Sequence, residues 1–223
     1  MLYIIATPIG NLKDITLRAL EILKKVDLIA CEDTRVTRKF LARYKIKTPL
    51  ISYHQHSKSQ KVNFLIGKLN EGKDIALVAD AGTPGISDPG NVLVAGAIKN
   101  NIKIVPIPGA SALTALISAA GIDTQKFIFL GFPPHKKGRE KFFREVIAQK
   151  YPVIYYDSVH RLVKNLKFFK ELKKEEFQVI VGRELTKMHE EIIRGSAEEA
   201  LEYFEKNPEK LRGEFVIIVK RLK

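Results

Sequence analysis

The loop ADAGTPGISDPG, residues 79–90, follows an apolar run and holds three glycines, two prolines and two aspartates. Glycine allows unusual backbone angles and close approach of a ligand, and proline stiffens a turn. The loop lacks the glycine spacing and the lysine of phosphate-binding loops. We therefore expect Asp80 and Thr83 to contact a ligand without phosphate, with a rigid strand-to-helix connection as the alternative. Asp88 is predicted to cap the next helix, with Pro89 at its first position.

Two further loops of small, stiff residues follow strand-like runs. ATPIGNL, residues 6–12, supplies Thr7, and VPIPGASALTAL, residues 105–116, enters a helix whose N-terminus can receive a carboxylate or a phosphate. Ser111 is either the cap of that helix or a ligand contact. Because the carboxyl ends of parallel strands lie on one sheet edge, the three loops could together form one binding trough.

Acid and base groups follow the second strand-like run, in CEDTR. Glu32, Asp33 and Arg35 are expected to face the same edge of the sheet, where carboxylates could accept protons and arginine could orient an anion. The alternative is ordinary helix capping by Asp33 or Thr34, with Arg35 and Arg38 in solvent.

His54 and His56 lie at i and i+2, which a strand would place on one face. No third ligand type is well spaced from them, so we expect no metal site and leave RNA or substrate binding open.

Basic groups in the second half suit phosphates, with a solvated charged face as the alternative. They comprise a compact loop with Lys136, Lys137 and Arg139, and a helix face with Arg161. The stretch GRELTKMHEEIIRG, residues 182–195, has a density of mixed charge that indicates a site or a subunit contact.

The composition points to a globular protein with a polyanionic partner. The chain has 223 residues, 45% of them hydrophobic, and a formal net charge of +13, which favours nucleic acid over a merely heat-adapted surface. The single cysteine, Cys31, excludes a disulfide framework and is expected in the core. No signal peptide or membrane span is recognisable, so we expect a soluble, cytoplasmic protein.

Strand-like and helical patterns alternate along the first half, which predicts a parallel sheet with helices on its faces. The strands are expected at 2–6, 28–31, 50–53, 75–79 and 102–107. A turn, a short strand, Pro-Pro and a basic loop near 120–132 indicate a boundary, so the predicted domains are 1–120 and 121–223. The second half predicts a mixed sheet, with strands at 153–156, 177–182 and 214–219 and helices near 140–149, 159–172 and 197–205.

Taken together, LYIIATPIGNLKDITLRALEIL, CEDTR, HQH, ALVADAGTPGISDPG, PIPGASALTALISAAGI, FLGFPP, HRL, GRELTK and EFVIIV closely resemble the bacterial ribosomal RNA small subunit methyltransferase I family, a branch of the tetrapyrrole methylase superfamily. The resemblance implies a two-domain α/β fold of the class III methyltransferases, commonly a homodimer, with S-adenosylmethionine in a cleft completed by the C-terminal domain. It also implies methylation of the ribose 2′-hydroxyl of a cytidine in the decoding region of 16S ribosomal RNA, without a metal.

The resemblance also implies roles for individual residues. The cofactor contacts would be Ile9, Asp80, Ala81, Gly82, Thr83, Pro84, Ile86, Gly109, Ala110, Ser111, Phe132, Tyr156, Gly182, Arg183 and Gly213. RNA contacts are expected from Arg35, Arg38, His54, His56, Lys136, Lys137, Arg139, Arg161 and Lys187. The candidates for a general base are Glu32, Asp33 and Glu184, among which the sequence does not choose.

The chain departs from the family in two places. Ser57 and Lys58 stand where relatives often have asparagine and glutamate, and many relatives continue beyond the position of Lys223. Two alternatives remain open: a methylase of the same superfamily acting on a tetrapyrrole carbon or on diphthine, and a non-catalytic ribosome-binding protein. The net positive charge favours RNA over the other substrates.

Overall fold

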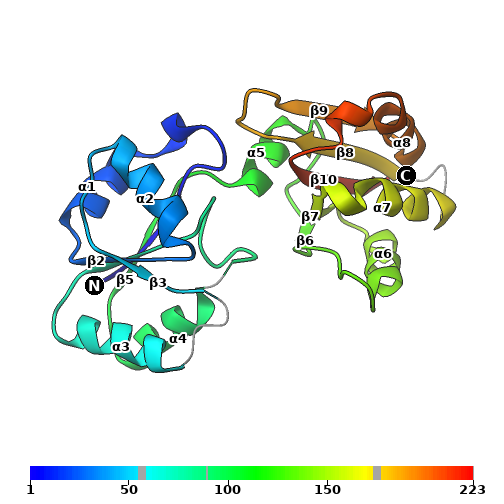
Figure 1. Cartoon of the computed structure of the whole chain (residues 1–223). Coiled ribbons are helices and arrows are strands. Elements are labelled where there is room, and N and C mark those ends of the chain that lie inside the picture. Colours follow the sequence, from blue (N-terminus) through cyan, green and yellow to red (C-terminus); the bar gives the residue numbers. More distant parts are fainter. Residues whose placement is uncertain (55–58, 89, 173–176, 223) are drawn as a thin grey trace. The chain divides into compact units, whose positions relative to one another are not determined.

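The computed structural model describes residues 1–54, 59–88, 90–172 and 177–222. The chain divides into two compact units, Met1–Ser111 and Ala112–Lys223. Figure 1 shows each unit as a sheet with helices packed on its faces. Among the described residues, no helix is both long enough and apolar enough to cross a membrane.

The first unit is built on a five-stranded parallel sheet in the order β3-β2-β4-β1-β5. Its strands are β1 (Leu2–Ile5), β2 (Leu28–Cys31), β3 (Leu50–Ser52), β4 (Ile75–Val78) and β5 (Ile104–Ile107). Its helices are η1 (Leu12–Asp14), α1 (Leu17–Lys25), α2 (Thr34–Arg43), α3 (Ser59–Asn70) and α4 (Asn91–Lys99). The predicted strands and the parallel sheet are confirmed.

Both faces of this sheet are covered, which explains why its strands read as continuous apolar runs. One core cluster joins Ile5 and Ile29 to Leu23 of α1 and Leu41 of α2. A second cluster on the other face joins the sheet to α3 and α4, through Leu65 and Leu93 among others. Cys31 is fully buried in the first cluster, as expected of a core residue.

The second unit holds a mixed five-stranded sheet in the order β6-β7-β10-β8-β9, in which only the β6–β7 pair is parallel. Its strands are β6 (Ile128–Phe129), β7 (Val153–Ser158), β8 (Phe177–Arg183), β9 (Glu191–Gly195) and β10 (Glu214–Arg221). Its helices are α5 (Ala112–Ala119), α6 (Arg139–Ala148), α7 (Val159–Leu172), α8 (Ala197–Lys206) and η2 (Pro208–Lys210). The mixed sheet confirms the prediction, whereas β9 lies within the stretch predicted only as a charged site.

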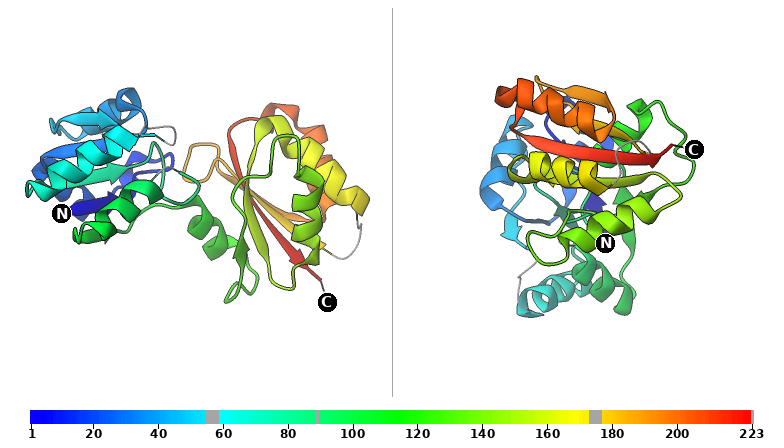
Figure 2. Two further views of the ribbon diagram at one scale, coloured as in Figure 1. Left: turned by 90° about the horizontal axis from the view of Figure 1, so that it is seen from below. Right: turned by 90° about the vertical axis from the view of Figure 1, so that its right-hand side faces the viewer.

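Helices α6, α7 and α8 gather on one face of the second sheet, as Figure 2 shows, around an aromatic-rich core with Phe143, Phe169 and Phe204. Helix α5 contacts β10, and an added Cβ at Gly182 would lie 2.8 Å from Leu116 of α5. These contacts place α5 in the second unit, so the division falls at residue 111, earlier than the predicted boundary at residue 120.

Candidate functional site

The loops after β1, β4 and β5 meet at the carboxyl edge of the first sheet. Thr7 and Gly82 exchange backbone hydrogen bonds of 2.9 and 3.1 Å, and the Thr7 hydroxyl donates to the Ala79 carbonyl at 3.1 Å. The Thr83 hydroxyl donates to the Ala110 carbonyl at 3.3 Å. The three loops singled out in the sequence are therefore held together by direct hydrogen bonds.

The strand order explains why a ligand site would form at this edge. From β1 the chain passes through α1 to β2 on one side, whereas from β4 it passes through α4 to β5 on the other. Neighbouring parallel strands whose connections leave in opposite directions open a crevice at their carboxyl ends, where α/β proteins bind ligands.

Glycine is required at two points of this edge. Gly82 has φ 79°, which L-residues rarely adopt, and an added Cβ there would lie 3.3 Å from Ile9 Cγ2. At Gly109 an added Cβ would lie 2.9 Å from Ala6 Cβ, closer than real Cβ contacts come. The small residues therefore allow the loop backbones to pack against one another. This packing requires glycine at both positions whether or not a ligand binds.

Three carboxylates share the same edge: Glu32 after β2, and Asp80 and Asp88 after β4. Burial, then the charge of Asp80, raises the pKa of Glu32, and His54 opposes the rise. Burial, then Glu32 and Asp80, raises the pKa of Asp88 from 3.8 to about 6. Glu32 and Asp88 are half-buried, whereas Asp80 is exposed at the mouth of the same edge, where its Oδ1 accepts the Asp33 N–H. We call Glu32, Asp80 and Asp88 the acidic edge.

The prediction that Asp88 caps the next helix is wrong. Helix α4 begins at Asn91 with Gly90 as its N-cap, and no side chain caps it. Pro89 lies outside the described residues. Among the described residues no donor forms a hydrogen bond with the Asp88 carboxylate. Its negative charge therefore adds to those of Glu32 and Asp80. The sequence signal for a place in the acidic edge was the presence of two aspartates in a loop at the carboxyl end of a strand. The interpretation of Asp88 as a helix cap led away from it.

Asp33, in contrast, is a helix cap, the alternative that the sequence left open. Its Oδ1 accepts the Arg35 N–H at 2.8 Å, and its Oδ2 pairs with the Arg35 guanidinium at 2.6 Å. The side-chain hydrogen bond from Arg35 and then its backbone N–H lower the pKa of Asp33 to about 2. The Asp33 backbone N–H donates to Asp80 Oδ1 at 3.1 Å, which ties the start of α2 to the acidic edge. His56, Ser57 and Lys58 lie outside the described residues.

In the second unit an aromatic pair joins the loop after β6 to β7: Phe132 is exposed, and Tyr156 is a half-buried residue within β7. Phe132 is 52% exposed, and its ring centroid lies 5.2 Å from that of Tyr156. Arg161 supports this loop, because its Nη1 donates to the Pro133 carbonyl at 2.7 Å and its Nε to Ser158 Oγ at 3.0 Å. Arg161, which was expected to contact RNA, therefore positions Pro133, the residue next to Phe132.

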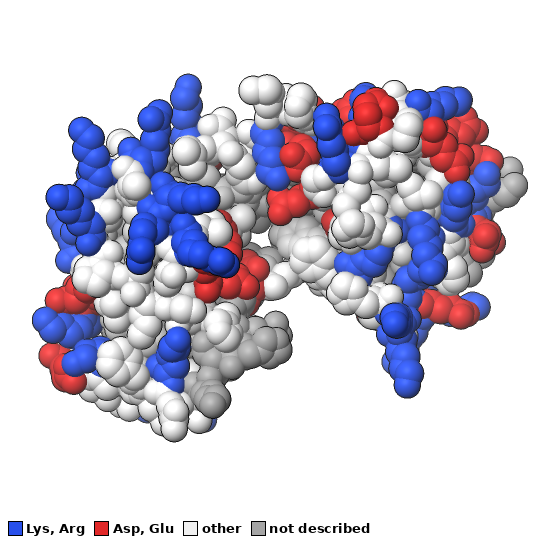
Figure 3. All heavy atoms as spheres, in the orientation of Figure 1, with Lys and Arg blue, Asp and Glu red and all other residues white. Residues whose placement is uncertain are grey.

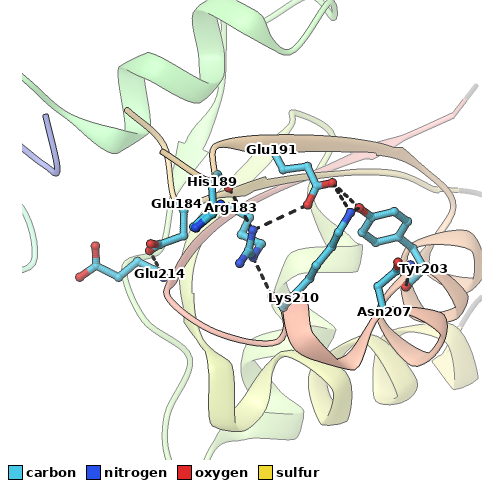
Figure 4. A network of polar contacts seen from close by, with 8 residues as sticks. All are labelled: Arg183, Glu184, His189, Glu191, Tyr203, Asn207, Lys210 and Glu214. Atoms are coloured by element: carbon cyan, nitrogen blue, oxygen red, sulfur yellow. Dashed lines mark hydrogen bonds and ion pairs between the residues drawn. The ribbon is translucent and has the colours of Figure 1, made fainter. Parts of the chain in front are cut away.

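Arg183 lies in a buried polar network, drawn in Figure 4. Only 3% of the residue is exposed, and its guanidinium donates to the carbonyls of Lys210 at 2.6 Å and His189 at 3.0 Å. Glu191 lies 3.8 Å from the same guanidinium and also binds Lys210 and Tyr203. The Arg183 side chain thus joins the β8–β9 loop to η2, and its charge is already engaged within the protein.

Glu184 also has a structural partner set, visible in Figure 4. Its Oε1 accepts from Lys187 Nζ at 2.7 Å and from the Glu214 N–H at 3.0 Å. Partial burial raises the pKa of Glu184, but these hydrogen bonds outweigh it and the net pKa is lowered. Gly213, with φ 91°, makes room for this contact, because an added Cβ would lie 2.2 Å from Glu184 Oε1.

The remaining predicted RNA contacts in the second unit differ in availability. Lys136 and Lys137 are exposed, whereas the Arg139 guanidinium lies 5.4 Å from the Phe168 ring centroid and Lys187 pairs with Glu184 and Glu214. No group of three metal-binding side chains is arranged to hold an ion within the described part of the chain.

Residues 1–201 match the family described as Tetrapyrrole (Corrin/Porphyrin) Methylases. The chain is 46% identical over 220 residues to the ribosomal RNA small subunit methyltransferase I of Synechocystis sp., covering 98% of this chain and 78% of that one. A relative of the same name from Borrelia garinii subsp. bavariensis is 43% identical over 225 residues, 99% of each chain. Among solved structures, a cobalt precorrin-4 methyltransferase superposes with TM-score 0.70 at 20% identity, over 98% of this chain and 94% of that one, which shows a shared fold.

Proposed function

We propose that this chain, which belongs to the tetrapyrrole methylase family, is an S-adenosylmethionine-dependent methyltransferase that methylates the 2′-hydroxyl of a cytidine ribose in the decoding region of 16S ribosomal RNA. The observation that carries the proposal is the identity of more than 40% along nearly the whole chain to relatives named for ribosomal RNA methylation. The solved structures of the superfamily are too distant in sequence to bear on substrate.

The loops of the first unit fit a cofactor that is a cation without phosphate. Neither residues 79–90 nor residues 108–111 contain lysine or arginine, and residues 79–90 supply two of the three carboxylates of the acidic edge. Carboxylates in partly dehydrated surroundings favour a positive charge such as a sulfonium. The proposed contacts in this unit are Ile9, Asp80, Ala81, Gly82, Thr83, Pro84, Ile86, Gly109, Ala110 and Ser111. When bound, S-adenosylmethionine supplies a methyl group that its sulfonium activates toward a ribose oxygen.

The proposed cofactor contacts of the second unit are of two kinds. The exposed ring of Phe132, packed on the half-buried Tyr156, offers aromatic surface on which a planar ring such as adenine can stack. The other proposed contacts are Gly182 and Arg183 at the end of β8 and Gly213 before β10, where the Arg183 side chain already binds carbonyls.

Among the three candidates for the general base, the protonation behaviour favours Glu32. A base must accept the proton of the 2′-hydroxyl, and a carboxylate with a raised pKa does so more readily than one with a lowered pKa. The pKa of Glu32 is raised, whereas ion pairs hold those of Asp33 and Glu184 down. Asp33 and Glu184 are therefore proposed to position the α2 start and the β8–β9 loop.

The test incubates the protein with S-adenosylmethionine carrying a labelled methyl group and with undermethylated small ribosomal subunits or their naked RNA. The label is then mapped by nuclease digestion and mass spectrometry. Label on a cytidine ribose is the expected result, and label on base atoms would refute the assignment. Isothermal titration with S-adenosylmethionine separates the enzyme from a non-catalytic ribosome-binding protein, because the latter would show no binding.

The same proposal includes a homodimer acting in the cytoplasm. Light scattering of the purified protein gives its mass in solution, and a monomer at all concentrations would contradict the dimer. Parallel assays with a tetrapyrrole and with diphthine test the alternative substrates of the superfamily.

A further inference from the structure

Helix α2 carries an exposed basic face. Arg35, Arg38, Lys39 and Arg43 are all exposed along Thr34–Arg43. Arg35, Lys39 and Arg43 follow one another at four-residue intervals, which places them on one side of the helix at steps of about 6 Å. No aspartate or glutamate occurs anywhere from Thr34 to Asn70. Figure 3 shows Lys and Arg side chains gathered over the helices α1 and α2 of this unit.

This arrangement disfavours the isolated helix. Like charges four residues apart repel one another, and cations in the first turn oppose the helix dipole. Among the described residues no acidic side chain forms an ion pair with Arg38, Lys39 or Arg43. Asp33 compensates Arg35 at the start of the helix, but nothing in the described fold does so for the other three, as a bound polyanion would.

Within the described part of the chain, several lysines on the helices of the second unit, unlike Lys39 of α2, form ion pairs with nearby glutamates. Lys167 pairs with Glu205 at 3.1 Å, Lys170 with Glu198 at 2.5 Å, and Lys206 with Glu202 at 3.1 Å. Those helices balance their charges locally, so the net charge of +13 does not spread evenly over the surface. On α2 the described residues provide such a partner for Arg35 alone, and Arg38, Lys39 and Arg43 gather positive charge without one.

We infer that the α2 face, defined by Arg35, Arg38, Lys39 and Arg43, binds the phosphate backbone of the RNA substrate. This inference rests on the proposed function. Helix α2 begins two residues after Glu32, and the Asp33 N–H joins its start to the acidic edge. Phosphates are attracted to the helix and repelled by the carboxylates beside it. The basic α2 face and the acidic edge together therefore hold the RNA backbone on α2. The acidic edge remains free for neutral or cationic groups.

An RNA fits this face better than a protein partner does. Val36, at 44% exposed, is the large apolar side chain that the face offers, so it lacks the apolar anchors that dominate protein interfaces. Phosphate contacts come instead from closely spaced arginine and lysine. In the second unit Arg139, Arg161 and Lys187 are already engaged with other groups. Of the predicted RNA contacts there, Lys136 and Lys137 remain exposed, so α2 offers the larger group of exposed cations.

The test compares two double variants that each remove two positive charges. Lys39→Gln/Arg43→Gln alters the α2 face. Lys99→Gln/Lys103→Gln alters exposed lysines at the end of α4 and before β5, where α4 packs on the opposite face of the same sheet. Fluorescence anisotropy measures the affinity of each for a labelled small-subunit RNA transcript over a range of KCl concentrations. Calorimetry with S-adenosylmethionine and light scattering are measured in parallel.

The α2 variant is expected to bind the RNA roughly 10- to 30-fold more weakly at about 0.15 M salt, with the salt slope reduced by about 0.7 to 0.9 for each lost phosphate contact. Its affinity for S-adenosylmethionine should be unchanged, and the α4 variant should bind RNA like the wild type. Equal losses in both variants, an unaltered salt slope in the α2 variant, or loss of a dimer in the α2 variant would overturn the inference. A wild-type protein that binds the cofactor but neither binds nor methylates RNA would instead refute the proposed function, and this inference with it.

Discussion

Replacing Asp88 with asparagine should stabilise the first unit at neutral pH and leave it unchanged in acid. Asparagine has the shape of the protonated aspartate but cannot ionise. In the folded protein, burial and the charges of Glu32 and Asp80 raise the pKa of Asp88 from 3.8 to about 6. The folded state therefore holds a proton that the unfolded state has already lost between these two pH values.

The sign and size of the effect follow from this difference. Because the folded state binds more protons, stability falls as pH rises from about 3.8, and the loss is complete above pH 6. Each pKa unit corresponds to 1.36 kcal/mol, but Asp88 is only half-buried and solvent screens part of the repulsion, so the full loss is about 1 to 2 kcal/mol. Asp88→Asn should thus raise the free energy of unfolding by about 1 to 2 kcal/mol at pH 7.5 and by close to nothing at about pH 3.5. Replacing Asp80 with asparagine first should shrink the gain, since part of it is repulsion between the two charges.

The assay must report the first unit separately, because a chain of two units can unfold in two steps. Urea titration at both pH values, followed by hydrogen exchange of peptides from β1 and β4, meets this need. Glu21→Gln, on the exposed side of α1, controls for the change in net charge. A gain of the same size at both pH values, or no gain at either, would show that the Asp88 carboxylate does not carry an unfavourable charge.

Three further predictions address the site. Thr83→Tyr should abolish binding of S-adenosylmethionine without unfolding the chain, and unchanged affinity in calorimetry would refute the placement of the cofactor. Glu32→Gln should lower kcat by about 10²- to 10⁴-fold with cofactor affinity retained, as expected for a lost general base; a kcat within a few fold of wild type would exclude that role. Gly213→Ala should destabilise the second unit by at least about 1 kcal/mol in urea denaturation, because alanine disfavours φ 91° and its Cβ would meet the Glu184 carboxylate. Glu184→Ala in the same chain should relieve the contact but not the backbone strain, so full recovery would argue against the strain.

Local patterns in the sequence predicted much of the fold. The apolar runs became the strands of the parallel sheet, and Thr16, a residue type typical of helix caps, caps α1 by accepting the Ala19 N–H at 3.1 Å. These features depend on residues close together in the chain, where periodicity and capping are decisive. The strand β9 is an exception, since its charged residues mask the alternation typical of a strand.

The roles of charged side chains were less predictable. Asp33 and Asp88 look alike in the sequence, yet one is an ion-paired helix cap and the other a partly buried carboxylate with a raised pKa. Arg161 was expected to contact RNA and Arg183 to contact the cofactor, yet both side chains donate to backbone carbonyls. Partners that lie far away in the chain decide each of these cases.

The sequence by itself determined most of the helices and strands, the loops that follow the strands, and the family. Helices, strands and loops depend on local patterns, and the family is recognised from motifs that occur in a fixed order. Only the tertiary structure decided which carboxylates share one edge, which arginines are already bound, and which positive charges remain unpaired. A side chain's pKa and availability depend on burial and on neighbours brought together by folding. Glu32, Asp80 and Asp88 illustrate the point, since they are separated along the chain and become one charged group only in the folded sheet.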